Sequence, residues 1–193
     1  MLRWVLCAAA AMVTTAGSAQ NYSNAYTFLK AVRDRDGAKV SAVVSEPGSV
    51  AINTREASTG EGGLHIVTRG RDLGWLNFLL GKGARPDIQD KSGETPLALA
   101  ARIGWVEGAQ ALIARRALVD QANGRGETPL IIATQNRDLA MVRLLLGAGA
   151  NPRRTDSAAG YSALDYAKAD TRSAAIVRLL EAPTAAPKKK YGP

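Results

Sequence analysis

Few side chains in this chain could carry out acid–base or nucleophilic chemistry. Its 193 residues include one histidine, His65, and one cysteine, Cys7. A thiolate cluster or a histidine-rich metal site needs several such ligands, and nucleophilic catalysis by cysteine needs an adjacent base. His65 is thus the only candidate acid or base near neutral pH. We predict no catalytic residue, no metal site and no cofactor.

Two other patterns could be mistaken for reactive sites. Carboxylates are paired at Asp34 and Asp36 and at Asp87 and Asp90, on predicted helix ends and turns, where turn capping or solvated charge is the ordinary explanation. The glycines of GKGA and GAGA look like a phosphate loop. They follow a predicted helix and lack the GK[ST] ending, so they are interpreted as helix stops.

Two tryptophans are interpreted as packing residues. Trp75 aligns with Met141 on a predicted second helix, which favours a place in the core between repeats. Trp105 falls at a predicted hairpin turn, where we expect a partly exposed aromatic ring. Neither residue indicates a cofactor.

The elements that would position any of these residues follow from an internal repeat. The five letters GETPL occur at 93–97 and again at 126–130. Equivalent leucines stand 33, 33 and 34 residues apart at Leu64, Leu97, Leu130 and Leu164. A degenerate fifth copy fits upstream at 28–49. A fixed period of this length is the signature of a stacked-repeat architecture.

Each repeat is predicted to be a helical hairpin. Thr95 can cap a first helix that begins at Pro96 and ends near Gly104. A second helix, stopped by Gly147, has one apolar face formed by Leu139, Val142, Leu145 and Leu146. One such unit cannot bury its apolar face alone, so neighbouring units must stack and share a core, in which we expect Leu112 and Leu145.

The period, the TPL entry and the GAGANP tail resemble ankyrin repeats over residues 24–182. The resemblance implies an all-α ankyrin-repeat solenoid of four to five stacked units, and implies that His65 ties turns together. The expected repeats cover 24–56, 57–92, 93–125, 126–159 and 160–182. An insertion at 57–60 is expected to lengthen the first turn. The outer repeats are expected to act as caps, with polar residues Arg172, Ser173 and Arg178 facing water.

The ends of the chain carry much of its charge. The formal net charge of +8 arises from 25 Lys and Arg against 17 Asp and Glu. Without Arg3 and Lys188–Lys190 the balance is 21 against 17, or +4, with the signs interspersed. We therefore expect no nucleic-acid partner. Residues 183–193 are predicted to be a flexible basic tail.

The N-terminus has the pattern of a secretory signal peptide. An apolar stretch at 4–13 follows Arg3, and small residues at 16–19 favour cleavage after Ala19. The stretch is shorter than a membrane span requires, so we expect no span after cleavage. Leu6 precedes Cys7 where a lipoprotein signal needs a small residue. These features predict a periplasmic protein of a Gram-negative bacterium, with residues 1–19 removed.

A non-catalytic module for protein–protein interaction follows from this architecture and from the lack of reactive clusters. Its expected partner is another exported or periplasmic protein, and the module itself is expected to be a monomer. The resemblance implies binding through the concave face of the stack, at Glu61, Arg69, Lys91, Glu94, Arg102, Ile103, Arg125, Glu127, Gln135 and Asn136. Two alternatives stay open: these residues are only solvated, or the protein is an accessory factor or weak enzyme in periplasmic oxidative-stress defence.

Overall fold

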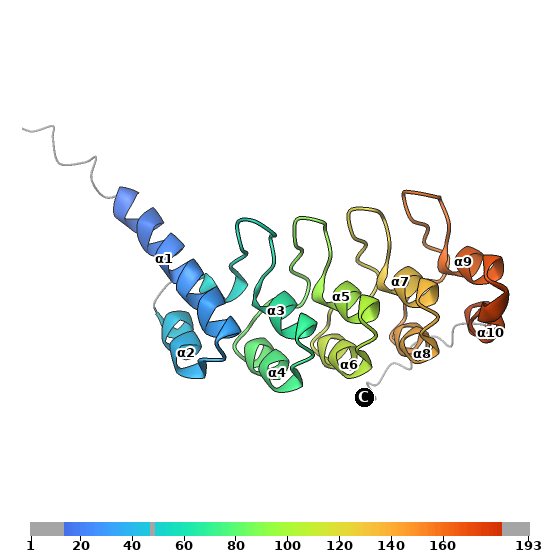
Figure 1. The fold of residues 1–193 in the computed structure, drawn as a ribbon, viewed down its shortest axis with the longest axis horizontal. Coiled ribbons are helices and arrows are strands. Elements are labelled where there is room, and N and C mark those ends of the chain that lie inside the picture. The colour runs from blue at the N-terminus through green and yellow to red at the C-terminus, as the bar shows by residue number, and fades with distance from the viewer. Residues whose placement is uncertain (1–13, 47–48, 183–193) are drawn as a thin grey trace, which may run out of the picture.

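Figure 1 shows helix pairs stacked side by side in a computed structural model that describes residues 14–46 and 49–182. The inner helices are α1 (Thr14–Arg33), α3 (Gly63–Arg69), α5 (Pro96–Arg102), α7 (Pro129–Gln135) and α9 (Ala163–Ala169). The outer helices are α2 (Gly37–Ser45), α4 (Leu73–Gly81), α6 (Val106–Ala114), α8 (Leu139–Gly147) and α10 (Ala174–Glu181). Short 3₁₀ turns cover Ala51–Asn53 and Thr171–Ser173. The predicted all-α solenoid of stacked helix pairs is confirmed; Cys7 and the predicted tail at 183–193 lie outside the described residues.

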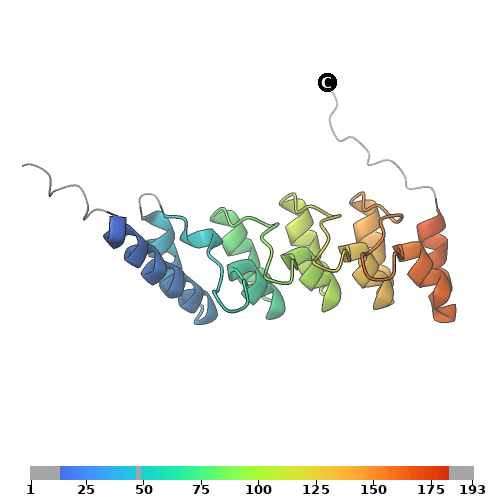
Figure 2. The ribbon, with the colours of Figure 1, turned by 90° about the horizontal axis from the view of Figure 1, so that it is seen from above.

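The pairs form three rows, seen in Figures 1 and 2. Inner helices lie beside inner helices, and outer helices lie beside outer helices. The loops that join each outer helix to the next inner helix project together in a row, and we call these loops the fingers. Helix α5 packs against α3 on one side and α7 on the other. Each middle repeat therefore depends on both of its neighbours.

The helices begin where their capping residues predict. The hydroxyl oxygen of Thr95 accepts a hydrogen bond from the Ala98 amide at 3.1 Å, and that of Thr128 accepts one from the Ile131 amide at 3.3 Å. These bonds satisfy amides that the first turn of a helix leaves without a partner. The outer helices α2, α4 and α8 are capped in the same way by Asp36, Asp72 and Asp138.

The core is one continuous apolar layer shared by the repeats. Leu112 and Leu145 are both 0% exposed, as predicted. In the middle repeats almost the whole inner helix is buried, because neighbouring helices cover it on two sides: every residue of 96–101 in α5 is buried. Burial on two sides explains why these inner helices are rich in Leu, Ile and Ala.

Trp105 is buried, at 5% exposed, and our expectation of a partly exposed ring is wrong. The physical reason is Gly108, three residues on in α6. A β-carbon at Gly108 would lie 2.0 Å from Cε3 of the Trp105 ring, so the missing side chain makes room for the indole. Trp75 packs against the core but is only half-buried, with its ring edge-on to Phe78 at a centroid distance of 5.1 Å.

The fingers are not all the same length. In the first, the Gly60 amide donates to the Glu56 carbonyl, whereas the Gly93 amide in the next donates to the closer Asp90 carbonyl. The predicted insertion at 57–60 is therefore confirmed. The last finger is also longer, because Leu164 follows Leu130 by 34 residues, and its Gly160 amide donates to the Asp156 side chain. Both long fingers contain an isolated antiparallel bridge, at Arg55–Gly62 and Thr155–Ser162.

Not all of the polar residues expected to be exposed in the last repeat are exposed. Arg172 and Arg178 are exposed, but Ser173 is 2% exposed, so its predicted outward position is wrong. Ser173 ends the 3₁₀ turn before α10, and its hydroxyl turns inward to donate to the Asp170 carboxylate at 3.2 Å.

The turns between inner and outer helices carry an inter-repeat contact that the sequence did not suggest. Left-handed backbone occurs there at Arg35, Arg71, Gly104 and Arg137. Arg35 pairs with Asp72 of the next repeat at 2.8 Å, and Arg137 pairs with Asp170 at 3.0 Å. Each bond joins the turn of one repeat to the start of the next outer element.

Candidate partner-binding surface

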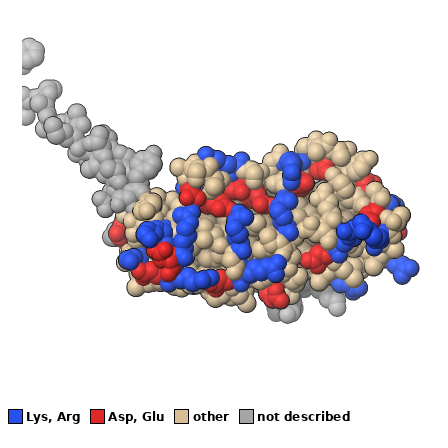
Figure 3. Space-filling model, viewed as in Figure 1, with Lys and Arg blue, Asp and Glu red and all other residues tan. Residues whose placement is uncertain are grey.

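Two positions of the repeat bring opposite charges together on the face formed by the inner helices and the fingers, which we call the inner face. Five residues after the repeat leucine, or after Phe28 in the first copy, stand Arg33, Arg69, Arg102 and Gln135. Three residues before the repeat leucine stand Glu61, Glu94, Glu127 and Tyr161. Figure 3 shows basic side chains in separate columns on this side of the molecule, with acidic side chains at their ends.

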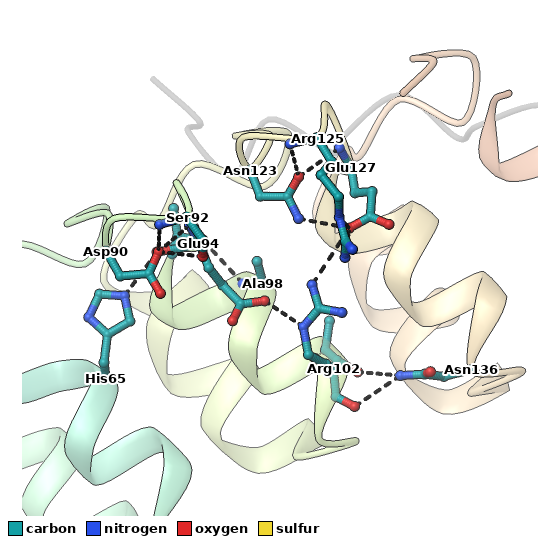
Figure 4. A network of polar contacts seen from close by, with 12 residues as sticks. His65, Asp90, Ser92, Glu94, Ala98, Arg102, Asn123, Arg125, Glu127 and Asn136 are labelled. Atoms are coloured by element: carbon teal, nitrogen blue, oxygen red, sulfur yellow. Dashed lines mark hydrogen bonds and ion pairs between the residues drawn. The ribbon is translucent and has the colours of Figure 1, made fainter. Parts of the chain in front are cut away.

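The helix arginines are ion-paired to finger carboxylates. Arg33 Nη2 lies 2.9 Å from Glu56, and Arg69 is paired to Glu61. Figure 4 shows that Arg102 Nε contacts Glu94 at 2.6 Å, within its own repeat. We call these pairs, together with the Glu127 contacts described next, the Arg–Glu row. Sequence reasoning missed Arg33 and Glu56, although Arg33 follows Phe28 by the spacing that joins Arg69 to Leu64.

Glu127 is the most enclosed acid of the row. It is 8% exposed, so its predicted outward position is wrong. Its Oε2 accepts hydrogen bonds at 2.8 Å from Asn123 Nδ2 and from Arg125 Nη2, and it lies 3.6 Å from Arg102 Nη2 of the preceding repeat. Burial alone would raise the pKa of Glu127, but the hydrogen bonds from Asn123 and Arg125 and the two guanidinium charges outweigh it and lower the pKa.

His65 is a structural residue, as the resemblance implied. It is 0% exposed, and its Nδ1 accepts a hydrogen bond from the Gly62 amide at 3.2 Å. With Nδ1 as acceptor, Nε2 carries the proton and donates to the Glu94 carbonyl in the next finger at 2.9 Å (Figure 4). Nδ1 thus caps the start of its own helix α3, and Nε2 joins this repeat to the next.

Two predicted binding residues belong instead to the turns between helices. Ile103 is half-buried, and its carbonyl accepts a hydrogen bond from Arg71. The Asn136 side chain donates at 3.0 Å to the Arg102 carbonyl at the end of α5 (Figure 4). Ile103 is therefore less outward than predicted, whereas Asn136 is exposed as predicted and also serves the contact between repeats.

The other predicted residues divide by exposure. Glu61 and Glu94 are half-buried beneath their arginines. The exposed members of the predicted set, apart from Asn136, are Arg69, Lys91, Arg102, Arg125 and Gln135. Basic and amide side chains therefore form the outer layer of this face.

At its C-terminal end the row becomes aromatic, which sequence reasoning did not notice. Tyr161 occupies the repeat position of the glutamates and lies edge-on to Tyr166 at 5.5 Å. The Tyr166 hydroxyl donates to Asp156, and this bond raises the pKa of Tyr166. Burial would raise the pKa of Asp156, but that bond and three backbone amides lower it. Alignment of Tyr161 with Glu127 was the available signal.

The inner face offers ion pairing, amide hydrogen bonding and aromatic contact. No cluster of three or more His, Cys, Asp or Glu side chains among the described residues is arranged to hold a metal ion. Within residues 14–46 and 49–182, no helix combines the length and apolar character that a membrane span requires.

Comparison with known proteins identifies the repeats. Residues 64–156 match the family model for ankyrin repeats in three copies. The chain is 36% identical to the zebrafish (Danio rerio) neurogenic locus notch homolog protein 1, covering 64% of this chain and 5% of that protein. It is 37% identical to a putative ankyrin repeat-containing protein of Treponema pallidum, covering 48% of this chain and 42% of that protein. The chain thus spans less than half of either relative.

The stack of helix pairs is consistent with an ankyrin-repeat solenoid, and the family match itself covers residues 64–156. Repeats of this kind indicate a protein-interaction module.

Proposed function

We propose that this protein is a non-catalytic binding module of the bacterial periplasm, which holds another exported protein on its inner face. The Arg–Glu row is the observation that carries the proposal. It places exposed arginines on a stack whose helices share one core, so the side chains are held in place before a partner arrives. A preordered surface loses less conformational entropy on binding.

Export through a cleaved signal peptide is compatible with the packing of α1. Among residues 24–33, the part of this helix whose burial is described, the buried positions are Phe28, Leu29, Ala31 and Val32. Cleavage after Ala19 would leave all four of these core residues in the mature chain. We expect the mature protein isolated from its host to begin at Gln20 and to fractionate with the periplasm. Mass spectrometry that finds Met1 or an acylated Cys7 would contradict export by this route.

The binding surface is tested with two variants of equal charge. The face variant carries Arg33→Gln, Arg69→Gln and Lys91→Gln. Arg102 and Arg125 are retained because both lie against the buried Glu127, and Arg102 also neutralises Glu94. The control variant removes three exposed arginines from the outer helices or their ends: Arg115→Gln, Arg143→Gln and Arg178→Gln.

Each full-length mature protein is used to capture binding proteins from periplasmic extract of the host. We expect the face variant to lose the partner and the control variant to retain it, with melting temperatures close to the parent because exposed ion pairs contribute only about 0–1 kcal/mol. Deletion of residues 188–193 should not affect capture. Equal loss in both variants, or loss only on the tail deletion, would refute binding at the inner face.

A further inference from the structure

The inner face has nearly balanced charges, but its two signs differ in exposure. The carboxylate side chains of Glu61, Glu94 and Glu127 are 16%, 12% and 11% exposed. The arginines paired with them are much more open: Arg69 is 59% exposed and Arg125 is 63% exposed. A partner that approaches this face therefore meets guanidinium groups first, with the acids lying underneath.

These guanidinium groups keep hydrogen-bonding capacity. An arginine has five N–H donors. Arg69 contacts Glu61 through Nη2, and Arg102 contacts Glu94 through Nε and approaches Glu127 through Nη2. The ion pair uses only part of the donor set and fixes the direction of the side chain. The remaining N–H groups suit a second carboxylate, which arginine binds through two parallel hydrogen bonds.

The C-terminal end of the face has a different chemistry. At Gln135 and Tyr161 the repeat replaces its arginine and its glutamate with uncharged side chains. Tyr161 is 48% exposed and its ring rests on Tyr166. An exposed tyrosine supported by a second ring is the kind of residue that contributes strongly to protein interfaces.

We propose that the inner face binds an acidic protein segment that lies along the stack. Aspartate or glutamate side chains of the segment pair with Arg33, Arg69, Lys91, Arg102 and Arg125, and an apolar or aromatic side chain of the segment packs on Tyr161. The inference rests on the proposed function, because it takes the inner face as the binding surface, and it adds the chemistry of the partner.

Nucleic acid fits this surface less well than an acidic peptide. A nucleic-acid strand carries closely spaced phosphates and is bound by continuous positive charge with aromatic platforms for its bases. Here four carboxylates, at Glu56, Glu61, Glu94 and Glu127, interrupt the positive charge, and the exposed aromatic ring lies at one end.

The proposal is tested by fluorescence anisotropy with labelled synthetic probes on the full-length mature protein. The first probe is a 14-residue peptide of alternating Glu and Ser that ends in Leu-Trp. The second has Lys in place of Glu, the third ends in Ser-Ser instead of Leu-Trp, and the fourth is a single-stranded oligonucleotide of similar length. Each is titrated into the parent, the face variant, the control variant and Tyr161→Ala at low and at high salt.

We expect the acidic peptide to bind the parent, to bind the face variant at least tenfold more weakly, and to bind the control variant unchanged. Tyr161→Ala should weaken the Leu-Trp probe several-fold and leave the Ser-Ser probe unaffected. Equal binding of the Lys peptide or of the oligonucleotide, or equal weakening by both variants, would overturn the proposal. If the native partner is lost by the face variant while no acidic peptide binds the parent, the acidic-segment inference fails and the binding function stands.

Discussion

Trp105 and Gly108 exchange the roles that two positions have in neighbouring repeats. The two neighbouring repeats cap the outer helix with an aspartate and place a large apolar side chain three residues later: Asp72 with Trp75, and Asp138 with Met141. In the third repeat the large side chain stands at the cap and glycine follows it. The indole of Trp105 then fills the space beside α6. In the Gly108→Met variant, the new methionine side chain would compete with the indole for that space.

The magnitudes follow from the distances. A β-carbon at position 108 would lie 2.0, 2.3 and 2.4 Å from three atoms of the Trp105 ring, so Gly108→Met must displace the ring. Overpacking of this kind should lower the free energy of unfolding by at least about 1–3 kcal/mol. Trp105→Asp removes a side chain that is 5% exposed, which should lower the free energy of unfolding by about 3–5 kcal/mol. The new aspartate cap should restore about 1 kcal/mol of this loss. The double variant restores the pattern of the neighbouring repeats. We expect its loss of unfolding free energy to be at least ~2 kcal/mol smaller than the sum of the losses in the two single variants.

The assay is urea and thermal unfolding followed by far-ultraviolet circular dichroism for the parent, both single variants and the double variant. For a chain of this size about 1 kcal/mol corresponds to roughly 2–4 °C in Tm. Gly108→Ala is the matched control with the smallest added side chain and should also destabilise the parent. Additive losses in the double variant, or a Gly108→Ala protein more stable than the parent, would refute the packing described for Trp105.

Three further predictions concern other contacts. Leu145→Ala should cost about 2–5 kcal/mol, because the side chain is 0% exposed in the shared core; an unchanged urea midpoint would contradict its assignment. His65→Leu should cost about 1–3 kcal/mol by leaving the Gly62 amide and the Glu94 carbonyl unpaired, and its melting temperature tests this. The amide of Arg172 is the largest cause that lowers the pKa of Asp170 from 3.8 to about 2, with Arg137 adding to it. Because the pKa is lower in the folded state, the ionised carboxylate stabilises that state above pH 3.8, and the stabilisation is lost as the pH falls toward 2. In acid titrations across this window, the Asp170→Asn variant should therefore lose less stability than the parent.

The repeat pattern alone predicted most of the fold. The period of Leu97 and Leu130 sets the stack, the Thr-Pro entries set the helix starts, and the apolar face set the burial of Leu145. These features are local or periodic, so a single chain displays them directly. The longer finger at 57–60 was visible for the same reason, because Phe28 and Leu64 stand 36 residues apart instead of 33.

The burial of polar side chains needed the tertiary structure. Glu127 and Ser173 are polar and were expected to face water, but Asn123, Arg125 and Asp170 satisfy them in buried positions. These partners lie only two to four residues away along the chain, but whether they close around a side chain depends on how the finger or turn folds back, which the sequence does not display.

The sequence by itself therefore determined that helix pairs stack and which apolar residues they bury, because the hydrophobic effect acts through composition and period. Only the tertiary structure decided how the charges of the inner face are layered, with exposed guanidinium groups of Arg69 and Arg125 above enclosed carboxylates. The physical reason is that burial of a side chain is set by the atoms that surround it, and in a solenoid those atoms come in part from the next repeat.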